Sequence, residues 1–263
     1  MEAYRYLAKM GFMKSLTYRF DLFASMLCQV LIMLAGVYLW RSAYANHATL
    51  NGLTKDQMVT YTVLAVVEST LFISGVEDSM SDGVYSGGIG VYFLRPASML
   101  GMFFANDMGD MVSAVFVKTI PGLVFGVLLF RILPPISAVS LLLSLISLVF
   151  SILIIWIMAA FIGIFTLWAM KLGNLGYLKN TVIAFLSGAM IPLWFFPKGL
   201  QNVLYFSPFP YTYQAPLAIY IGQTGPGAAL RVIATQIFWL VLLFALLNWT
   251  WSRGRQRVMV QGG

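Results

Sequence analysis

The feature that most constrains this chain is a long apolar run, Ile132–Met170, which contains no charged side chain. A helix rises about 1.5 Å per residue, so crossing roughly 30 Å of hydrocarbon takes about 20 predominantly apolar residues. The run is too long for one crossing, and Pro134 and Pro135 lie near its start. We therefore predict a tight turn over residues 131–135 and a membrane-spanning helix over about Val139–Phe165.

The composition also indicates a membrane protein. Of the 263 residues, 60% are hydrophobic and only 10% are charged, whereas soluble domains are about 45–50% apolar and roughly 25% charged. A water-facing surface cannot be built from such a composition, which excludes a soluble enzyme, a disordered chain and a secreted disulfide scaffold. The net charge of +7 then indicates cytoplasmic loops and contact with anionic membrane lipids, and no nucleic-acid partner is expected.

Further apolar segments complete the prediction of an all-α integral membrane protein with six transmembrane helices. The five other predicted spans are Leu22–Trp40, Gln57–Val76, Met111–Phe130, Asn180–Phe196 and Val232–Trp251. The uncharged stretch before the sixth span is broken by prolines and glycines. We predict that residues 198–230 form short, partly re-entrant helices on the outer side of the membrane.

Six spans place both termini on the same side of the membrane. If that side is cytoplasmic, the inner segments hold ten Lys and Arg residues and the outer segments hold five. The positive-inside rule therefore favours cytoplasmic termini in an integral, multi-pass protein. We expect the membrane to be a bacterial inner membrane.

The first 20 residues are not apolar enough to span a membrane. On a helical wheel Arg5, Lys9 and Arg19 cluster, and the segment also carries bulky aromatic residues. We predict an interfacial helix over residues 1–20 in the inner headgroup layer, with a frayed basic tail as the alternative. The first apolar run begins only at Leu22 and no cleavage pattern lies nearby, so we expect it to be a retained span.

Motifs for nucleotide hydrolysis and for common catalytic centres are absent from the sequence. No Gly-Lys dipeptide occurs, so a phosphate-binding loop of the G-x-x-x-x-G-K-[ST] type is excluded. The chain has a single histidine, His47, and a single cysteine, Cys28. We therefore predict no catalytic residue, no metal site and no cofactor bound by this chain.

The segment 77–96, between the second and third predicted spans, changes from polar to apolar. It reads as a short polar helix, a glycine break and an apolar turn that Pro96 ends. We expect Ile89, Tyr92, Phe93 and Leu94 to be exposed on the cytoplasmic side, which would be unfavourable unless a soluble partner covered them. The alternative is an ordinary solvated loop. The residues that we assign to this segment's function are Asp82, Gly83, Gly87, Ile89, Tyr92, Phe93, Leu94, Arg95 and Pro96.

A second group of residues, rich in Gly, Pro and aromatic side chains, lies in the fifth span and just after it. These residues are an aromatic belt at the membrane interface or, alternatively, an outer gate for amphipathic substrates. A proline-broken pore or receptor loop would give the same pattern. The candidate residues are Gly188, Pro192, Trp194, Phe196, Pro197, Pro208 and Phe209.

Together the two segments resemble the ATP-binding-cassette type-2 (ABC-2) permeases. Gly87, Ile89 and the run Leu94-Arg95-Pro96 match the order of residues in that family's coupling segment. The second group resembles the family's Gly and Pro pattern in the fifth span, its outer re-entrant helix and its Pro-Phe turn.

The resemblance implies a permease subunit without its own ATPase site. Its implied partners are two cytoplasmic ABC ATPase subunits, which bind ATP and Mg, and a second permease chain, identical or sister, that completes a dimer. It also implies that the coupling segment docks in the ATPase, where Arg95 pairs with acidic groups. The substrate would be amphipathic or hydrophobic and would move outward.

Four ionisable residues lie within or beside the predicted spans: Glu68, Asp107, Asp110 and Lys118. Because a charge in the middle of a bilayer costs several kcal/mol, each needs a partner or a watery cavity. Their depths predict an ion pair between Glu68 and Lys118, or a small network that includes Asp110. A structural role and a role in substrate or proton chemistry both remain open.

Two other classes of function remain open from the residues. A secondary transporter or channel that works without ATP would need inverted internal repeats, and the two halves show no convincing similarity. An intramembrane enzyme or scaffold would need clustered carboxylates or a histidine at one membrane face, and only Asp107 and Asp110 approach this. Lipids, drugs, peptides and ions all remain candidate substrates.

Overall fold

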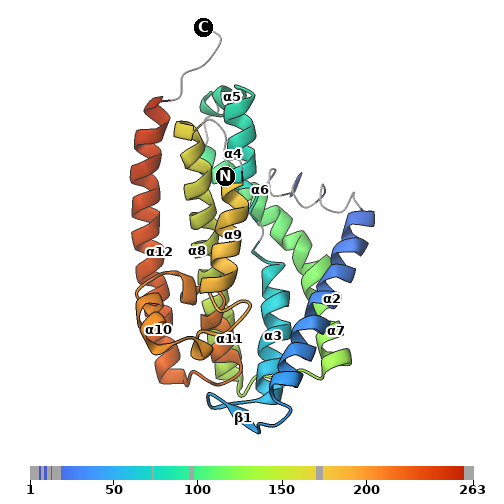
Figure 1. Cartoon of the computed structure of the whole chain (residues 1–263). Coiled ribbons are helices and arrows are strands. Elements are labelled where there is room, and N and C mark those ends of the chain that lie inside the picture. The colour runs from blue at the N-terminus through green and yellow to red at the C-terminus, as the bar shows by residue number, and fades with distance from the viewer. Residues whose placement is uncertain are drawn as a thin grey trace.

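The computed structural model describes residues 19–72, 74–94, 98–169 and 174–257, together with four residues near the N-terminus. Within these ranges the chain is almost entirely helical (Figure 1). The interfacial helix predicted over residues 1–20 falls mostly outside the described residues. Arg95 and Pro96 of the predicted coupling segment also lie outside them, as does the side chain of Phe93.

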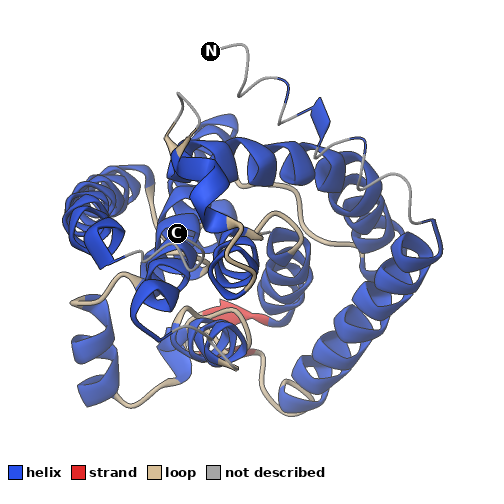
Figure 2. Ribbon diagram, turned by 90° about the horizontal axis from the view of Figure 1, so that it is seen from above, coloured by secondary structure: helices blue, strands red, loops and turns tan. Residues whose placement is uncertain are grey.

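Among the described residues, four helices are long and apolar enough to cross a membrane. They are α2 (Arg19–Ala43), the continuous helix Met99–Phe130, α8 (Ala138–Ala169) and α12 (Pro226–Gly254). Helices α8 and α12 pack along each other (Figure 1). Seen from above, α2 lies obliquely, whereas several other helices are seen nearly end-on (Figure 2). These helices make the chain a multi-pass membrane protein, with four long apolar helices in its described part.

The helix Met99–Phe130 is irregular and starts earlier than predicted. It consists of four consecutive parts: α6 (Met99–Ala114), the π-helical η1 (Val115–Thr119), α7 (Ile120–Phe125) and the π-helical η2 (Gly126–Phe130). Pro121 lies two residues after the end of η1 and has no N–H to donate, a common reason for a widened turn in a helix. Because the helix begins at Met99, Asp107 and Asp110 lie inside it, and not near the inner start of a span.

The predicted second span, Gln57–Val76, differs in the structure. Helix α3 (Lys55–Ser69) begins with a capping box in which Gln57 N donates to Thr54 Oγ1 and Thr54 N donates to Gln57 Oε1. The helix ends after 15 residues, short of the about 20 that a crossing needs. A non-helical stretch follows, and α4 (Val76–Tyr85) then begins.

The predicted fifth span, Asn180–Phe196, is also interrupted. Helix α9 (Leu175–Leu186) has 12 residues, and Gly188 just after it has φ +86°. A side chain is disfavoured in that conformation, and a Cβ there would lie 2.9 Å from Tyr61 Oη. Pro192 follows and prevents the helix from resuming directly.

Short elements gather at the end of the molecule opposite α5 (Ile89–Phe93; Figure 1). The strands β1 (Thr49–Leu50) and β2 (Leu53–Thr54) form an antiparallel hairpin, in which Asn51 and Gly52 both have positive φ. Residues 198–225 form short helices and turns, since their prolines interrupt longer helices, whereas residues 226–230 of the predicted re-entrant segment already belong to α12. The short helices at this end are η3 (Leu193–Phe195), α10 (Lys198–Tyr205), η4 (Phe209–Tyr211) and α11 (Gln214–Tyr220).

Two of the apolar cores matter for the site. One joins α4, α6, α8 and α12 and includes Met80, Trp156 and Leu247, all buried. The other joins α2, α3 and α11 and includes Tyr61 and Leu217. The first core packs α4 against α6, α8 and α12. The position of α4 therefore depends on three helices that lie far apart in the sequence.

Candidate functional site

Helices α4 and α5 (Ile89–Phe93) lie at one end of the molecule (Figure 1). The break between them is set by Gly87, which has φ +72°, a conformation that glycine adopts without strain. The Ser86 hydroxyl donates to Asp82 O at 2.7 Å and accepts from Gly88 N at 3.3 Å. These bonds close the turn between the two helices.

The segment α4–α5 divides its apolar side chains between the core and the surface. Ile89 is buried beside Met80, and the half-buried Tyr92 ring packs on Phe103 with centroids 5.1 Å apart. Leu94, by contrast, is 87% exposed, and Val91 is exposed as well. The prediction of exposed apolar residues is therefore right for Leu94 and wrong for Ile89 and Tyr92, because one face of this short helix packs on the bundle.

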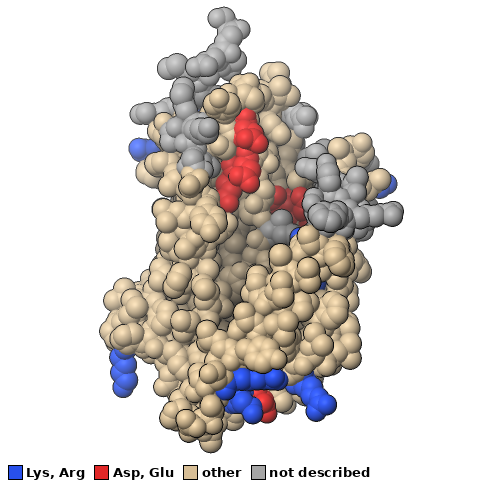
Figure 3. All heavy atoms as spheres, turned by 45° about the vertical axis from the view of Figure 1, so that its right-hand side comes forward, with Lys and Arg blue, Asp and Glu red and all other residues tan. Residues whose placement is uncertain are grey.

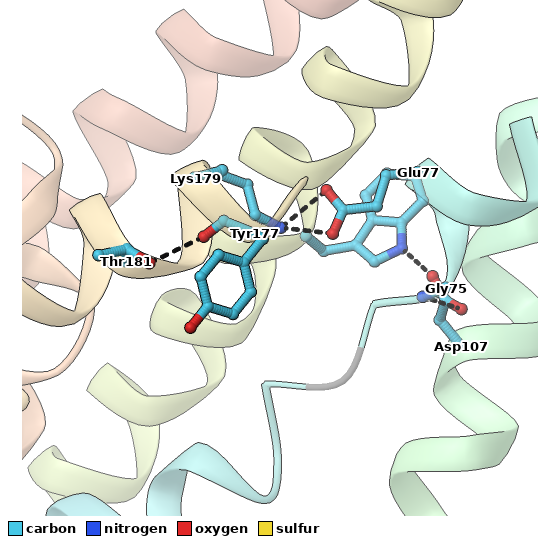
Figure 4. Close-up of polar contacts among 7 residues, drawn as sticks. Gly75, Glu77, Asp107, Tyr177, Lys179 and Thr181 are labelled. Carbon is cyan, nitrogen blue, oxygen red and sulfur yellow. Dashed lines mark hydrogen bonds and ion pairs between the residues drawn. The ribbon is translucent and has the colours of Figure 1, made fainter. Parts of the chain in front are cut away.

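Among the described residues, one salt bridge is present, and it anchors α4. Lys179 Nζ on α9 lies 3.1 Å from Glu77 Oε1 and 2.9 Å from Glu77 Oε2 (Figure 4). Both side chains are only 8% exposed. Gly176 permits the close approach, because a Cβ there would lie 3.2 Å from the Glu77 carboxylate carbon. Glu77 is in the first turn of α4, where the helix dipole also favours a negative charge.

Asp107 forms a second anchor for the same helix. Its Oδ1 accepts from Gly75 N at 3.0 Å and its Oδ2 accepts from Trp156 Nε1 at 2.8 Å (Figure 4). Gly75 is the N-cap of α4, and Asp107 is 1% exposed. A single carboxylate thus joins the start of α4 to α6 and α8.

The predicted pair between Glu68 and Lys118 is not present in the structure. Glu68 is 8% exposed and its Oε2 makes no hydrogen bond, and the described residues contain no salt bridge from Lys118. Lys118 lies in the π-helical η1, where extra residues per turn rotate it away from the face that an α-helix predicts. Asp110 is not joined to Glu68; its Oδ2 accepts from Asn106 Nδ2 at 3.4 Å.

Sequence reasoning missed Lys179 and Trp156 as partners. Lys179 counts in the sequence only as one of several inner basic residues, and Glu77 as part of a polar helix. The two are 102 residues apart, and no local pattern joins them. The sequence could have indicated that Asp107 has a partner, because a carboxylate inside a membrane-spanning helix requires a hydrogen-bond donor. It could not indicate which residue donates.

Two members of the second group of predicted residues, Gly188 and Trp194, contact Tyr61 in the middle of α3. Tyr61 Oη donates to Gly188 O at 2.8 Å, and the Trp194 ring lies edge-on to the Tyr61 ring at 5.8 Å. Leu193 N donates to Gln214 Oε1 at 2.7 Å. Pro192 is buried, Trp194, Phe196, Pro208 and Phe209 are half-buried, and Pro197 is exposed.

An apolar cavity of about 650 Å³ lies between the start of α6, α8 and α12. Its lining includes Phe104, Trp156 and Trp251, with Ser98 and Asn248 as polar members. Within the described part of the chain, no group of three or more His, Cys, Asp or Glu side chains could hold a metal ion.

The charges on the surface are separated along the molecule. On the face in Figure 3, acidic side chains gather toward one end, basic side chains gather at the other, and the surface between them is hollowed. The exposed acidic residues of α4 are Asp78 and Asp82.

Comparison with known proteins identifies the chain. A family model described as "ABC-2 family transporter protein" matches residues 30–262. No curated protein and no solved structure matches the chain.

Proposed function

Because the chain belongs to the ABC-2 family of transporter proteins, we propose that it is the membrane-spanning permease subunit of an ABC exporter. It moves an amphipathic or hydrophobic substrate outward, and residues 1–263 act as one permease domain. Two copies of a separate cytoplasmic ATPase subunit bind ATP and Mg and supply the energy. A second permease chain, identical or sister, completes the assembly in a bacterial inner membrane.

One observation carries this proposal: α5 and the residue after it present exposed apolar side chains at one end of the molecule. Leu94 and Val91 are 87% and 55% exposed, and Tyr85 at the end of α4 is 75% exposed. In water such a surface is unfavourable unless a partner covers it. The ATPase is the partner that this family requires, so this end is the cytoplasmic one. Helix α2 begins and α12 ends toward it (Figure 1), which supports cytoplasmic termini.

The two anchors of α4 give the coupling segment, residues 77–96, a mechanical role. When the ATPase subunits close on ATP, they displace α5 and with it α4. Since Glu77 ties α4 to α9 and Asp107 ties it to α6 and α8, the displacement reaches the long helices as a rigid-body motion. The breaks at Gly188, Pro192 and Pro197 let the short helices at the outer end rearrange, and Arg95 adds a charged contact to the ATPase.

The proposal is tested by purifying the chain together with its ATPase subunit and reconstituting both in liposomes. Leu94→Asp is expected to reduce copurification of the ATPase and to abolish ATP-driven transport, while membrane insertion is unchanged. The matched control is Phe206→Asp, since Phe206 is 84% exposed at the other end of the molecule. This control is expected to keep the ATPase bound.

Two outcomes would overturn the proposal. One is transport by the purified chain alone, without ATPase and ATP. The other is full retention of the ATPase and of ATP-driven transport in Leu94→Asp, which would remove the α5 surface from the coupling.

A further inference from the structure

The apolar cavity between the start of α6, α8 and α12 is open on one side. Its volume of about 650 Å³ lies in the range of about 300–1,000 Å³ that is usual for ligand sites. Val241 and Phe244 line it and are each more than half exposed, whereas Trp156 and Leu247 line it and are buried. The cavity is therefore a groove that leads from the exposed surface of α12 into the first apolar core.

Water is a poor occupant of this groove. A buried water makes about two to four hydrogen bonds to polar groups, and Ser98 and Asn248 supply the only side-chain oxygens of the lining. Asn248 Nδ2 already donates to Phe244 O at 3.0 Å, within α12. If the groove stayed empty, its walls would lose their dispersion contacts. An apolar ligand is the occupant that suits such walls.

The length and polarity of the groove match one leaflet of a membrane. On α12 the lining runs from Leu240 to Trp251, about 16 Å at about 1.5 Å per residue, and half of a hydrocarbon core is about 15 Å thick. Ser98 is the N-cap of α6 and Asn248 lies near the end of α12, so both polar residues are toward the end that carries α5 (Figure 1). Trp251 is at this end as well, as expected for a tryptophan at a membrane interface.

A membrane helix of a second protein chain fits the groove less well than a lipid. Helices that pack together in membranes meet through small residues, which let their backbones approach closely. Apart from Ser98 and Gly101, the lining consists of larger side chains, most of them Leu, Phe and Trp. A flexible acyl chain can follow walls of this kind, whereas a helix of about 10 Å diameter cannot enter between them.

The buried wall of the groove is connected to α4 through Trp156. The Phe104 and Trp156 rings, both part of the lining, pack edge-on with centroids 4.9 Å apart. Trp156 Nε1 donates to Asp107 Oδ2, and Asp107 Oδ1 accepts from Gly75 N at the start of α4 (Figure 4). A ligand that packs on these rings restrains the indole, and with it the hydrogen bonds that hold α4.

We propose that the groove binds one acyl chain of a membrane phospholipid from the leaflet nearer to α5, and that the bound chain stabilises the start of α4. The headgroup then lies at the end of the groove where Ser98 and Asn248 are found. This inference goes beyond the proposed function, because it requires neither the ATPase nor a transported substrate.

The test measures lipid binding to the purified full chain by native mass spectrometry. The chain, in tetraethylene glycol monooctyl ether, is titrated with palmitoyl-oleoyl-phosphatidylcholine. The expected result is one bound lipid with a half-saturating concentration about tenfold below that of any further lipid. Dihexanoyl-phosphatidylcholine has the same headgroup and is expected to bind about tenfold more weakly, because its short chains bury less apolar surface.

Variants assign the bound lipid to the groove. Val241→Trp adds a large ring to the lining and is expected to raise the half-saturating concentration by about tenfold. The matched control is Val127→Trp, since Val127 is 54% exposed against 63% for Val241 and does not line the groove. This control is expected to bind as the parent does. If Val241→Trp does not fold, Phe244→Ala replaces it, with an expected weakening of about threefold from the lost contact area.

Hydrogen exchange of the backbone amides tests the connection to α4. With saturating palmitoyl-oleoyl-phosphatidylcholine, the amides at the start of α4, including Gly75, are expected to exchange about fivefold more slowly. Val241→Trp is expected to lose this protection and Val127→Trp to keep it. The amides of α10, at the other end of the molecule, serve as an internal reference that stays unchanged.

Three results would overturn the inference. One is a series of bound lipids of equal affinity that Val241→Trp, or Phe244→Ala in its place, leaves unchanged. Another is a dimer of the chain that carries no lipid, with the groove covered by the second copy. The third is unchanged exchange at α4 with lipid bound, which would remove the connection through Trp156. A normal lipid response in a chain that neither binds an ATPase nor transports would count against the proposed function and leave the groove in place.

Discussion

The carboxylate of Glu77 and the ammonium of Lys179 are 2.9 Å apart at their closest and 102 residues apart in sequence. This pair fixes the start of α4 to α9, and Asp107 fixes the residue before α4 to α6 and α8. The helix that leads to the exposed α5 surface is therefore held at its base by charged groups that are almost fully buried. The predictions below concern these contacts and the turns that position them.

Removing one partner of the Glu77–Lys179 pair leaves the other charge buried and alone. Glu77→Gln and Lys179→Met are each expected to lower the free energy of unfolding by about 3–5 kcal/mol. The double variant is expected to recover much of this loss, since no unpaired charge remains. Melting curves in nanodiscs measure the effect, with the exposed Asp78→Asn as a control that stays within about 0.5 kcal/mol of the parent. Strictly additive losses in the double variant would contradict a direct pair.

Asp107 is expected to be sensitive to loss of its charge. In Asp107→Asn one of the two acceptor oxygens becomes an amide nitrogen, which cannot accept from Gly75 N or Trp156 Nε1. The expected loss of stability is about 1–3 kcal/mol. Trp156→Phe removes the indole donor, and a double-mutant cycle between the two positions measures their coupling energy, expected at about 0.5–3 kcal/mol. A coupling energy of zero would show that the hydrogen bond does not contribute.

Gly188 is expected not to tolerate a side chain. Its φ of +86° disfavours alanine, and a Cβ would lie 2.9 Å from both Tyr61 Oη and Gln214 Oε1. Gly188→Ala is therefore expected to lower stability by about 1–3 kcal/mol. The control is Gly199→Ala in α10, where a Cβ meets no atom within 4 Å and alanine favours the helix by up to about 1 kcal/mol. Equal melting temperatures for the two variants would refute the steric argument.

Arg95 is expected to act in coupling and not in folding. Arg95→Glu should uncouple ATP hydrolysis from transport without loss of membrane insertion, because its charge is assigned to the contact with the ATPase. The measurement compares ATPase rate and substrate flux in the same liposomes, with Arg255→Glu near the end of the described chain as a matched charge change. Unaltered coupled transport in Arg95→Glu would remove this residue from the mechanism.

The charge-free run Ile132–Met170 correctly predicted a break and a long helix; residues 131–137 are non-helical, a longer stretch than the predicted tight turn, and the helix is Ala138–Ala169. The same reasoning predicted spans that run past the observed ends of α3 and α9. Apolar residues continue past Ser69 and Leu186, so hydropathy gives no signal there. These helices stop because of backbone geometry, such as the positive φ of Gly188, and because of contacts with distant segments.

In the candidate site, too, local sequence predicted some features and tertiary packing decided the others. The pattern of residues 77–96 predicted a short polar helix, a glycine break and an apolar turn from local sequence; the structure has α4 and the Gly87 break as predicted, but the apolar part forms a second short helix, α5. Which apolar residue is buried was decided by packing against α6, since Tyr92 rests on Phe103. The expected Glu68–Lys118 pair was wrong because it assumed regular helices, and η1 is π-helical.

The sequence by itself determined that this protein lies in a membrane, that it is helical and which family it belongs to. Long apolar runs and short motifs are properties of neighbouring residues, so they can be read without the fold. Only the tertiary structure decided which buried charges meet. Glu77 forms a salt bridge with Lys179, and Asp107 accepts a hydrogen bond from Trp156, whereas Glu68 Oε2 makes no hydrogen bond. The physical reason is that a buried charge needs a partner within a few ångströms, and which residue lies that near depends on how separate helices pack.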